Sequence, residues 1–184
     1  MSVAAVNSLK DLEDLRYPIG RFETPAAISR EMVEAAIKVL DEMPERLRRA
    51  IEELSGQRID TPYRPGGWTV RQLVHHVAES HMHAFLRVRL ALTEEWPTIK
   101  PYDEVACAEL QDQRAPVEWS LVLVESLHAR WVMMLQRVEG EQWRRGFVHP
   151  VNGKTTVEGA TLQYAWHAQH HTAHIERLKL RERW

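Results

Sequence analysis

The sequence predicts an all-α protein that folds as a single four-helix bundle. Four long segments carry the helical repeat of apolar residues, and two of them open with N-terminal capping signals. One long connection separates the second segment from the third, as in bundles with a crossover. At 184 residues the chain suffices for one domain with a hydrophobic core. We therefore expect residues 1–184 to form one domain, in which residues 1–16 are a flexible N-terminal extension.

The first predicted helix runs from about Ser29 to Leu54. Its apolar positions repeat at helical spacing from Met32 onward, so they form one stripe. Ser29 is a suitable N-cap because its side-chain oxygen can accept a hydrogen bond from a free backbone N–H of the first turn. Pro44 lies inside the segment and lacks a backbone N–H, so we expect a kink or a break there.

The second predicted helix runs from Thr69 to about Leu92. Thr69 and Gln72 form a capping box, in which each side chain accepts a hydrogen bond from the other residue's backbone N–H. Trp68 and Leu73 stand at the positions of a hydrophobic staple. These signals fix the start of the helix.

A long crossover, residues 93–115, joins the second and third helices and is expected to hold a short helix at about 103–111. The third helix is predicted at 116–138, with a proline in its first turn. The fourth is predicted at 155–181, opened by a second capping box at Thr155–Glu158.

Composition excludes several classes of function. The chain carries 24 basic and 26 acidic residues, a formal net charge of −2, and has no basic surface suited to nucleic acid. No apolar run reaches membrane-spanning length, and the N-terminus has no signal-peptide core. The only cysteine, Cys107, allows no intramolecular disulfide, which fits a reducing compartment. We expect a cytoplasmic protein with neither a nucleic-acid nor a membrane partner.

The number and spacing of the histidines indicate the chemistry of this protein. The chain has 10, and eight of them fall in the windows 75–83 and 167–174 of the second and fourth helices. His167 and His171 are four residues apart and project from one helix face, and His76 starts near the core of another helix. Three imidazoles suit zinc or nickel and leave a coordination position open to activate water. The sequence therefore predicts a catalytic divalent-metal site at His76, His167 and His171.

Other histidines have less definite interpretations. His83 and His128 are interpreted as hydrogen-bonded core residues, as a single inward histidine usually is. His75, His81 and His170 fit either surface positions or partners of the ligands.

Two segments resemble the metal-ligand segments of the DinB-like superfamily, in its YfiT-type branch: Gly66–Met82 and Trp166–Ile175. Shorter stretches match in order, namely Tyr17–Gly20, Asp60–Arg64, Leu92–Glu95, Pro101–Glu104, His128–Trp131 and Gly146–Pro150. The resemblance implies an up-down-down-up bundle and one nickel or zinc ion per subunit of a homodimer. It places the ligands at His76, just before Val-Ala, and at His167 and His171, and leaves His174 out of the ligand set.

Three functions remain open. The first is hydrolysis of a small-molecule substrate by metal-activated water, for which Glu79 is either a proton carrier or an ordinary exposed glutamate. The second, which the resemblance also implies, is transfer of a low-molecular-weight thiol such as bacillithiol to an electrophile. That reaction needs no protein base, so the lack of an obvious one favours it. The third is a non-catalytic metal-binding or stress-associated protein.

Overall fold

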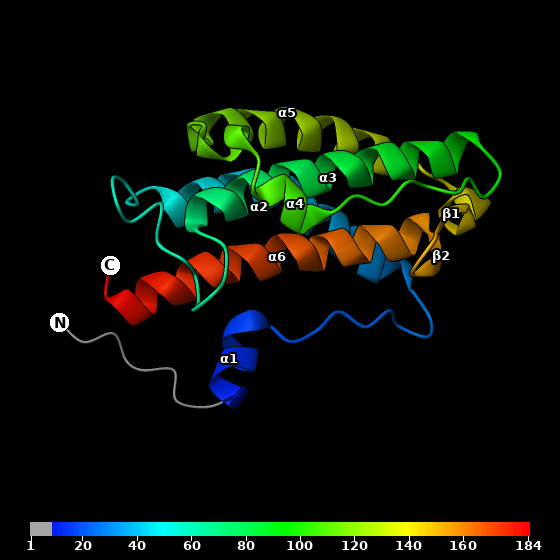
Figure 1. Ribbon diagram of the computed structural model, residues 1–184. Coiled ribbons are helices and arrows are strands. Elements are labelled where there is room, and N and C mark those ends of the chain that lie inside the picture. Colours follow the sequence, from blue (N-terminus) through cyan, green and yellow to red (C-terminus); the bar gives the residue numbers. More distant parts are fainter. Residues whose placement is uncertain (1–8) are drawn as a thin grey trace.

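A computed structural model describes residues 9–184 and shows an elongated, mostly helical protein (Figure 1). Its elements in chain order are α1 (Leu9–Arg16), α2 (Arg30–Ile51), α3 (Val70–Thr93), α4 (Glu104–Ala108), η1 (Gln111–Arg114), α5 (Val117–Leu135), η2 (Gly140–Arg144), β1 (Gly146–His149), β2 (Gly153–Thr156) and α6 (Val157–Glu182). The four long helices α2, α3, α5 and α6 are the four that the sequence predicts.

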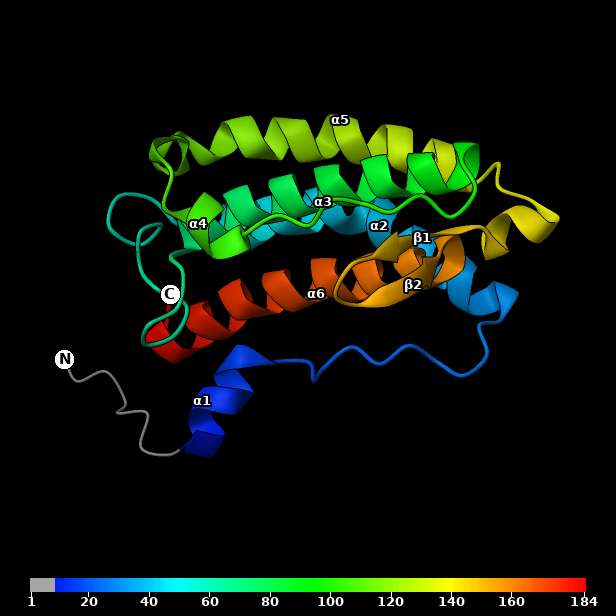
Figure 2. The same cartoon turned by 45° about the vertical axis from the view of Figure 1, so that its right-hand side comes forward.

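These four helices form an up-down-down-up bundle. Helix α2 packs against α5 and α6, and α3 packs against the same two helices. Arg48, near the end of α2, lies 3.0 Å from Glu118 at the start of α5, so these two helices are antiparallel. Helices α3 and α5 run in one direction and α2 and α6 in the other (Figures 1 and 2). The predicted topology is confirmed.

The crossover between α3 and α5 runs back along the outside of α3, so that α5 starts where α3 starts (Figure 2). The Gln72 side chain donates to the Ala108 carbonyl at 2.9 Å, and Arg71 donates to the Ala115 carbonyl at 3.0 Å. These bonds from the first turn of α3 anchor the end of the crossover. The short helix expected there is present as α4.

Helix starts follow the capping chemistry of the sequence with one correction. Thr69 and Gln72 form both bonds of the predicted capping box, at 3.1 and 3.0 Å. At the fourth helix the N-cap is Thr156, which accepts from the Gly159 N–H at 3.1 Å. The capping box expected from Thr155 is therefore wrong by one residue, because the third helical position is a glycine without a side chain to reciprocate.

The structure bears on two further expectations. Helix α2 continues through Pro44 without a break. Residues 9–16, expected within a flexible extension, form α1, which packs on α6 (Figure 1). The ring of His174 in α6 donates to the carbonyl of Arg16 at 3.1 Å and so holds the end of α1 in place. The rest of that extension, residues 1–8, lies outside the described residues.

A two-stranded antiparallel hairpin, β1–β2, precedes α6 and pairs Gly146 with Thr156. Its turn needs Gly153, whose φ of 78° is in the left-handed region. Arg145, just before β1, donates to the carbonyls of Ala91 and Glu94 at 2.9 and 2.8 Å. The hairpin is thereby tied to the end of α3 and closes this end of the bundle.

The apolar core is divided into two clusters along the bundle. In α2 the division falls between Leu40 and Met43, and in α3 between Ala78 and Ala84. The cluster nearer the hairpin contains Leu40, and the other contains Met43. Buried histidines from several helices lie at the level of this division.

Candidate metal centre

Three histidines from two helices, two of them buried and one half-buried, converge inside the bundle. His76 comes from the second turn of α3, and His167 and His171 come from adjacent turns of α6. One ligand nitrogen from each ring lies within 4.8 Å of the other two. The ring centroid of His76 lies 5.4 Å from that of His167 and 4.9 Å from that of His171. The structure thus brings together the three residues that the sequence selects.

The local fold aims these rings. Because the capping box fixes where α3 begins, it sets the rotation at which His76 leaves the helix. The indole of Trp68, one residue before the cap, lies against the His76 ring with centroids 4.6 Å apart. On α6, the four-residue spacing places the His167 and His171 rings 4.4 Å apart.

All three imidazoles are held neutral. Burial, with a smaller contribution from the neighbouring His170, lowers the pKa of His76 to about 4. Burial and the adjacent rings also lower the pKa of His167 and His171 well below the ordinary value. A neutral imidazole has one nitrogen lone pair free to bind a metal. A divalent ion of borderline softness fits this donor set of three nitrogens.

His167 is held from behind by another imidazole. Its Nδ1 lies 3.0 Å from Nε2 of His81, a fully buried residue of α3. His81 in turn bonds through Nδ1 to Nε2 of His128 in α5, at 2.9 Å. The sequence allows His81 as either a surface residue or a partner of the ligands, and it predicts His128 as a core histidine. The structure makes both of them members of one hydrogen-bonded chain behind the ligand.

Hydroxyl groups lie beside the triad on its more accessible side. His167 is half-buried, whereas His76 and His171 are buried. The Ser80 hydroxyl lies 3.5 Å from His167 Nε2. Burial raises the pKa of Tyr102 to about 12 and also raises that of Tyr164, and the Ser80 side chain interacts with both phenols. These phenols therefore stay protonated at neutral pH and can donate hydrogen bonds there.

A second group of buried histidines adjoins the first. His170, His171 and His174 also have ligand nitrogens within 4.8 Å of one another, and the Nδ1 atom of each is buried without a hydrogen-bond partner. This group shares His171 with the first. Because a neutral imidazole has a single lone pair, an ion at the first group leaves the second with two ligands. The group that spans two helices, His76 with His167 and His171, is therefore the better candidate for a metal site.

The remaining side chains that the sequence left open have other contacts. His75 is buried and bonds to the Ser120 hydroxyl at 2.7 Å. His83, expected in the core, is only half-buried and stacks on Tyr102 with ring centroids 4.2 Å apart. The carboxylate of Glu79 accepts from the Gln113 amide at 2.6 Å, and burial raises its pKa.

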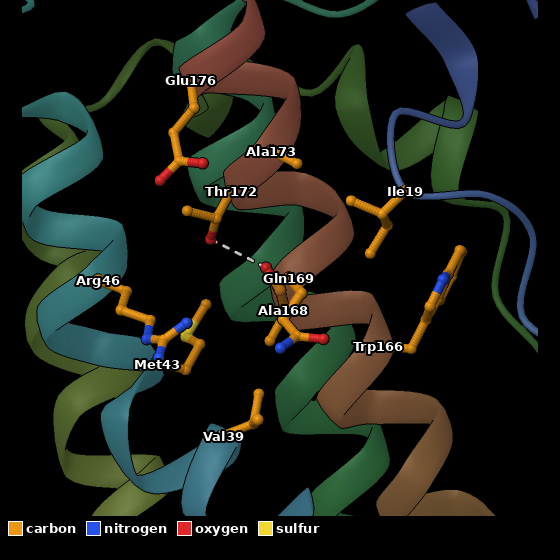
Figure 3. Close-up of a pocket in the computed structure, with 10 residues that line it drawn as sticks. All are labelled: Ile19, Val39, Met43, Arg46, Trp166, Ala168, Gln169, Thr172, Ala173 and Glu176. Atoms are coloured by element: carbon orange, nitrogen blue, oxygen red, sulfur yellow. Dashed lines mark hydrogen bonds between the residues drawn. The ribbon is translucent and has the colours of Figure 1, made fainter. Parts of the chain in front are cut away.

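A groove of about 460 Å³ lies elsewhere, between α2 and α6 (Figure 3). Val39 and Met43 from α2 line it together with Ala168 and Gln169 from α6 and with Ile19, and no residue of the triad does. In Figure 3 the Thr172 hydroxyl bonds back to the Ala168 carbonyl, at 2.9 Å. This groove therefore does not include the candidate metal centre.

The fold and this site define a class: an all-α bundle with a histidine-built candidate metal centre. The chain belongs to the DinB superfamily, whose family model matches residues 39–175. Within the described residues, no helix has the length and apolar character needed to cross a membrane.

Close relatives extend the comparison over nearly the whole chain. Proteins from Bacillus cereus (strain 03BB102) and Bacillus thuringiensis subsp. konkukian are each 50% identical over 173 residues, which covers 94% of this chain and 100% of theirs. Both carry the name "Putative metal-dependent hydrolase". Among solved structures, YfiT from Bacillus subtilis is 46% identical, with a TM-score of 0.91, and the match covers 93% of this chain and 99% of that one. YfiT is described as a probable metal-dependent hydrolase with an unusual four-helix bundle topology.

Proposed function

We propose that this protein is a divalent-metal-dependent hydrolase whose ion is held by His76, His167 and His171. The observation that carries the proposal is the convergence of three neutral imidazoles, two buried and one half-buried, with ligand nitrogens within 4.8 Å of one another. The names of the relatives point in the same direction. A zinc or nickel ion bound there supplies Lewis-acid polarisation and lowers the pKa of water at the coordination position that three ligands leave open.

The surrounding residues have separable roles in this proposal. Because the triad is most exposed at His167, a small substrate approaches from the side of Ser80, Tyr102 and Tyr164. The two protonated phenols donate hydrogen bonds to a substrate oxygen that gains negative charge in the transition state. The apolar clusters on both sides of the triad exclude bulk water and so strengthen these interactions.

The test begins with metal content, measured on protein purified without a histidine tag. We expect His76→Ala, His167→Ala and His171→Ala each to lose most of the bound ion, together with turnover of small ester or amide substrates. His75→Ala is the matched control, since it removes a buried imidazole of α3 that bonds to Ser120 instead. Full metal occupancy in any of the three triad variants would contradict the proposed ligand set.

Thiol transfer is a second candidate, and one observation favours it. Glu79, the glutamate nearest to His76 in sequence, already accepts a hydrogen bond from Gln113 on one of its carboxylate oxygens. Transfer of a low-molecular-weight thiol needs no protein base, because bound metal lowers the pKa of the thiol itself. Metal-loaded protein incubated with bacillithiol and a chromogenic electrophile distinguishes the reactions. Conjugate formed without ester or amide turnover would replace hydrolysis by transfer.

The assembly and location of the protein stay predictions. We expect a homodimer, which size-exclusion chromatography with light scattering measures directly, and a cytoplasmic location with no nucleic-acid partner.

A further inference from the structure

A chain of hydrogen bonds crosses all four helices of the bundle and ends on a ligand of the candidate metal centre. It runs from the Leu40 carbonyl in α2 to His128 in α5, then to His81 in α3 and His167 in α6. The three distances are 2.6, 2.9 and 3.0 Å. Leu40, His81 and His128 are at most 1% exposed, so water does not compete for these bonds.

The chain starts at a carbonyl that Pro44 sets free. In an α-helix the carbonyl of residue 40 accepts from the N–H of residue 44. Residue 44 is a proline inside a continuous helix, so it offers no N–H and leaves this carbonyl without its helical partner. The Nδ1 atom of His128 takes that place. The proline that looks unfavourable in the sequence thus exposes an acceptor inside the core.

The carbonyl fixes the proton of each ring in turn. Because a carbonyl can only accept, Nδ1 of His128 carries a hydrogen, and its Nε2 is then the acceptor of a neutral ring. His81 must therefore donate through Nδ1, which leaves its own Nε2 as an acceptor for the Nδ1–H of His167. The outcome is a His167 ring whose lone pair is on Nε2, the nitrogen that has the Ser80 hydroxyl at 3.5 Å and that remains for a metal.

We propose that Pro44 and the Leu40 carbonyl set the tautomer of the metal ligand His167 through the positioning residues His128 and His81. Partners of metal-bound histidines commonly fix ring orientation and tautomer, with a cost of about 10- to 100-fold in affinity when they are removed. Here the fixed acceptor is three hydrogen bonds away from the ligand nitrogen. The effect of this chain on metal binding rests on the proposed function, whereas the predicted tautomers of the three histidines are independent of that function.

Long-range ¹H–¹⁵N spectra of metal-free protein with ¹⁵N-labelled histidine measure each tautomer directly. We expect His128, His81 and His167 all to carry the proton on Nδ1. A proton on Nε2 of His167 or His81 in the wild-type protein would overturn the proposal. Since this measurement needs neither a variant nor bound metal, it stands whether or not the protein is a hydrolase.

The variant His128→Phe removes both nitrogens while keeping an aromatic ring beside His81 and Trp131. We expect the Nε2-protonated form of His167 to appear and the dissociation constant for zinc, measured by competition with a chromogenic chelator, to rise about 10- to 100-fold. His75→Phe is the control and should keep both the tautomer and the dissociation constant. If His128→Phe retains the wild-type His167 tautomer and zinc affinity, the chain does not control the ligand. If the variant does not fold, the wild-type spectra still test the predicted tautomers of His128, His81 and His167.

Discussion

Acid should destabilise the metal-free protein strongly and well above the pH at which carboxylates titrate. Burial lowers the pKa of His76, His128 and His170 to about 4 and that of His174 to about 3. In the unfolded chain each of these groups titrates near its ordinary value of about 6.5. Below that pH these histidines are protonated in the unfolded state but remain neutral in the folded state. Stability is therefore complete above about pH 6.5 and falls as the pH drops toward the folded pKa values.

The size of the effect follows from the same shifts. Between the folded and unfolded pKa values, each group lowers the free energy of unfolding by about 1.4 kcal/mol for every pH unit of acidification. At pH 5.5 the four histidines together cost about 5 kcal/mol relative to pH 7.5. A typical domain has a free energy of unfolding of about 5–15 kcal/mol, so this loss takes a large share of it. The lowered pKa values of His81, His167 and His171 act in the same direction.

Urea unfolding followed by circular dichroism, in the presence of a chelator, measures the free energy of unfolding at the two pH values. The matched variant is His170→Phe, which keeps an aromatic ring stacked on Trp166 but cannot be protonated. It should lose about 1.4 kcal/mol less stability between pH 7.5 and 5.5 than the wild type does. A wild-type difference below about 1 kcal/mol would show that the buried histidines are already protonated or solvated, and the reasoning would fail.

Two further outcomes can be measured on the same material. A divalent ion at about 100 times its dissociation constant should stabilise the fold by about 2.7 kcal/mol, which raises the Tm of a domain of this size by roughly 5–11 °C. A thermal-shift assay with and without chelator checks this, and an unchanged Tm would argue against a site formed by the folded state. Thr69→Ala removes the hydroxyl of the capping box at α3 and should cost about 1 kcal/mol in urea unfolding. Thr69→Ser, which keeps the acceptor, should stay near wild type, and equal losses in both variants would exclude the cap as the cause.

The positions of the long helices could be predicted because their signals are local. The start of α3 at the Thr69 capping box depends on residues within one turn, and the apolar repeat extends over several turns. Residues 9–16 carry no comparable signal, since their order depends on contact with α6, including the bond between Arg16 and His174. The hairpin before α6 likewise depends on Arg145 binding to the end of α3. Such contacts connect parts of the chain that helical periodicity does not relate.

The same distinction explains the site. The pair His167 and His171 is visible in the sequence because four-residue spacing alone puts two rings on one face. The roles of His81 and His128 are not visible, because they depend on how α3 and α5 are rotated against α6. Pro44 is the one local sign of the chain behind His167, and of the kink or break that the sequence predicts there, the break does not occur. The carbonyl that it frees is satisfied by a side chain from another helix, so the α-helix continues.

The buried histidines also explain why one arrangement of these helices is specified. Apolar clusters on either side of the division tolerate small changes of packing, since dispersion and burial are not directional. The hydrogen bonds from Leu40 to His167 are directional, and each donor has a single acceptor in a region without water. A shift of any helix by one turn would leave at least one buried polar group without a partner, at a cost of roughly 1–3 kcal/mol for each group. The hydrogen-bonded chain from Leu40 to His167 therefore also fixes the register of all four helices. Changes at His81 or His128 should affect metal affinity and helix register together.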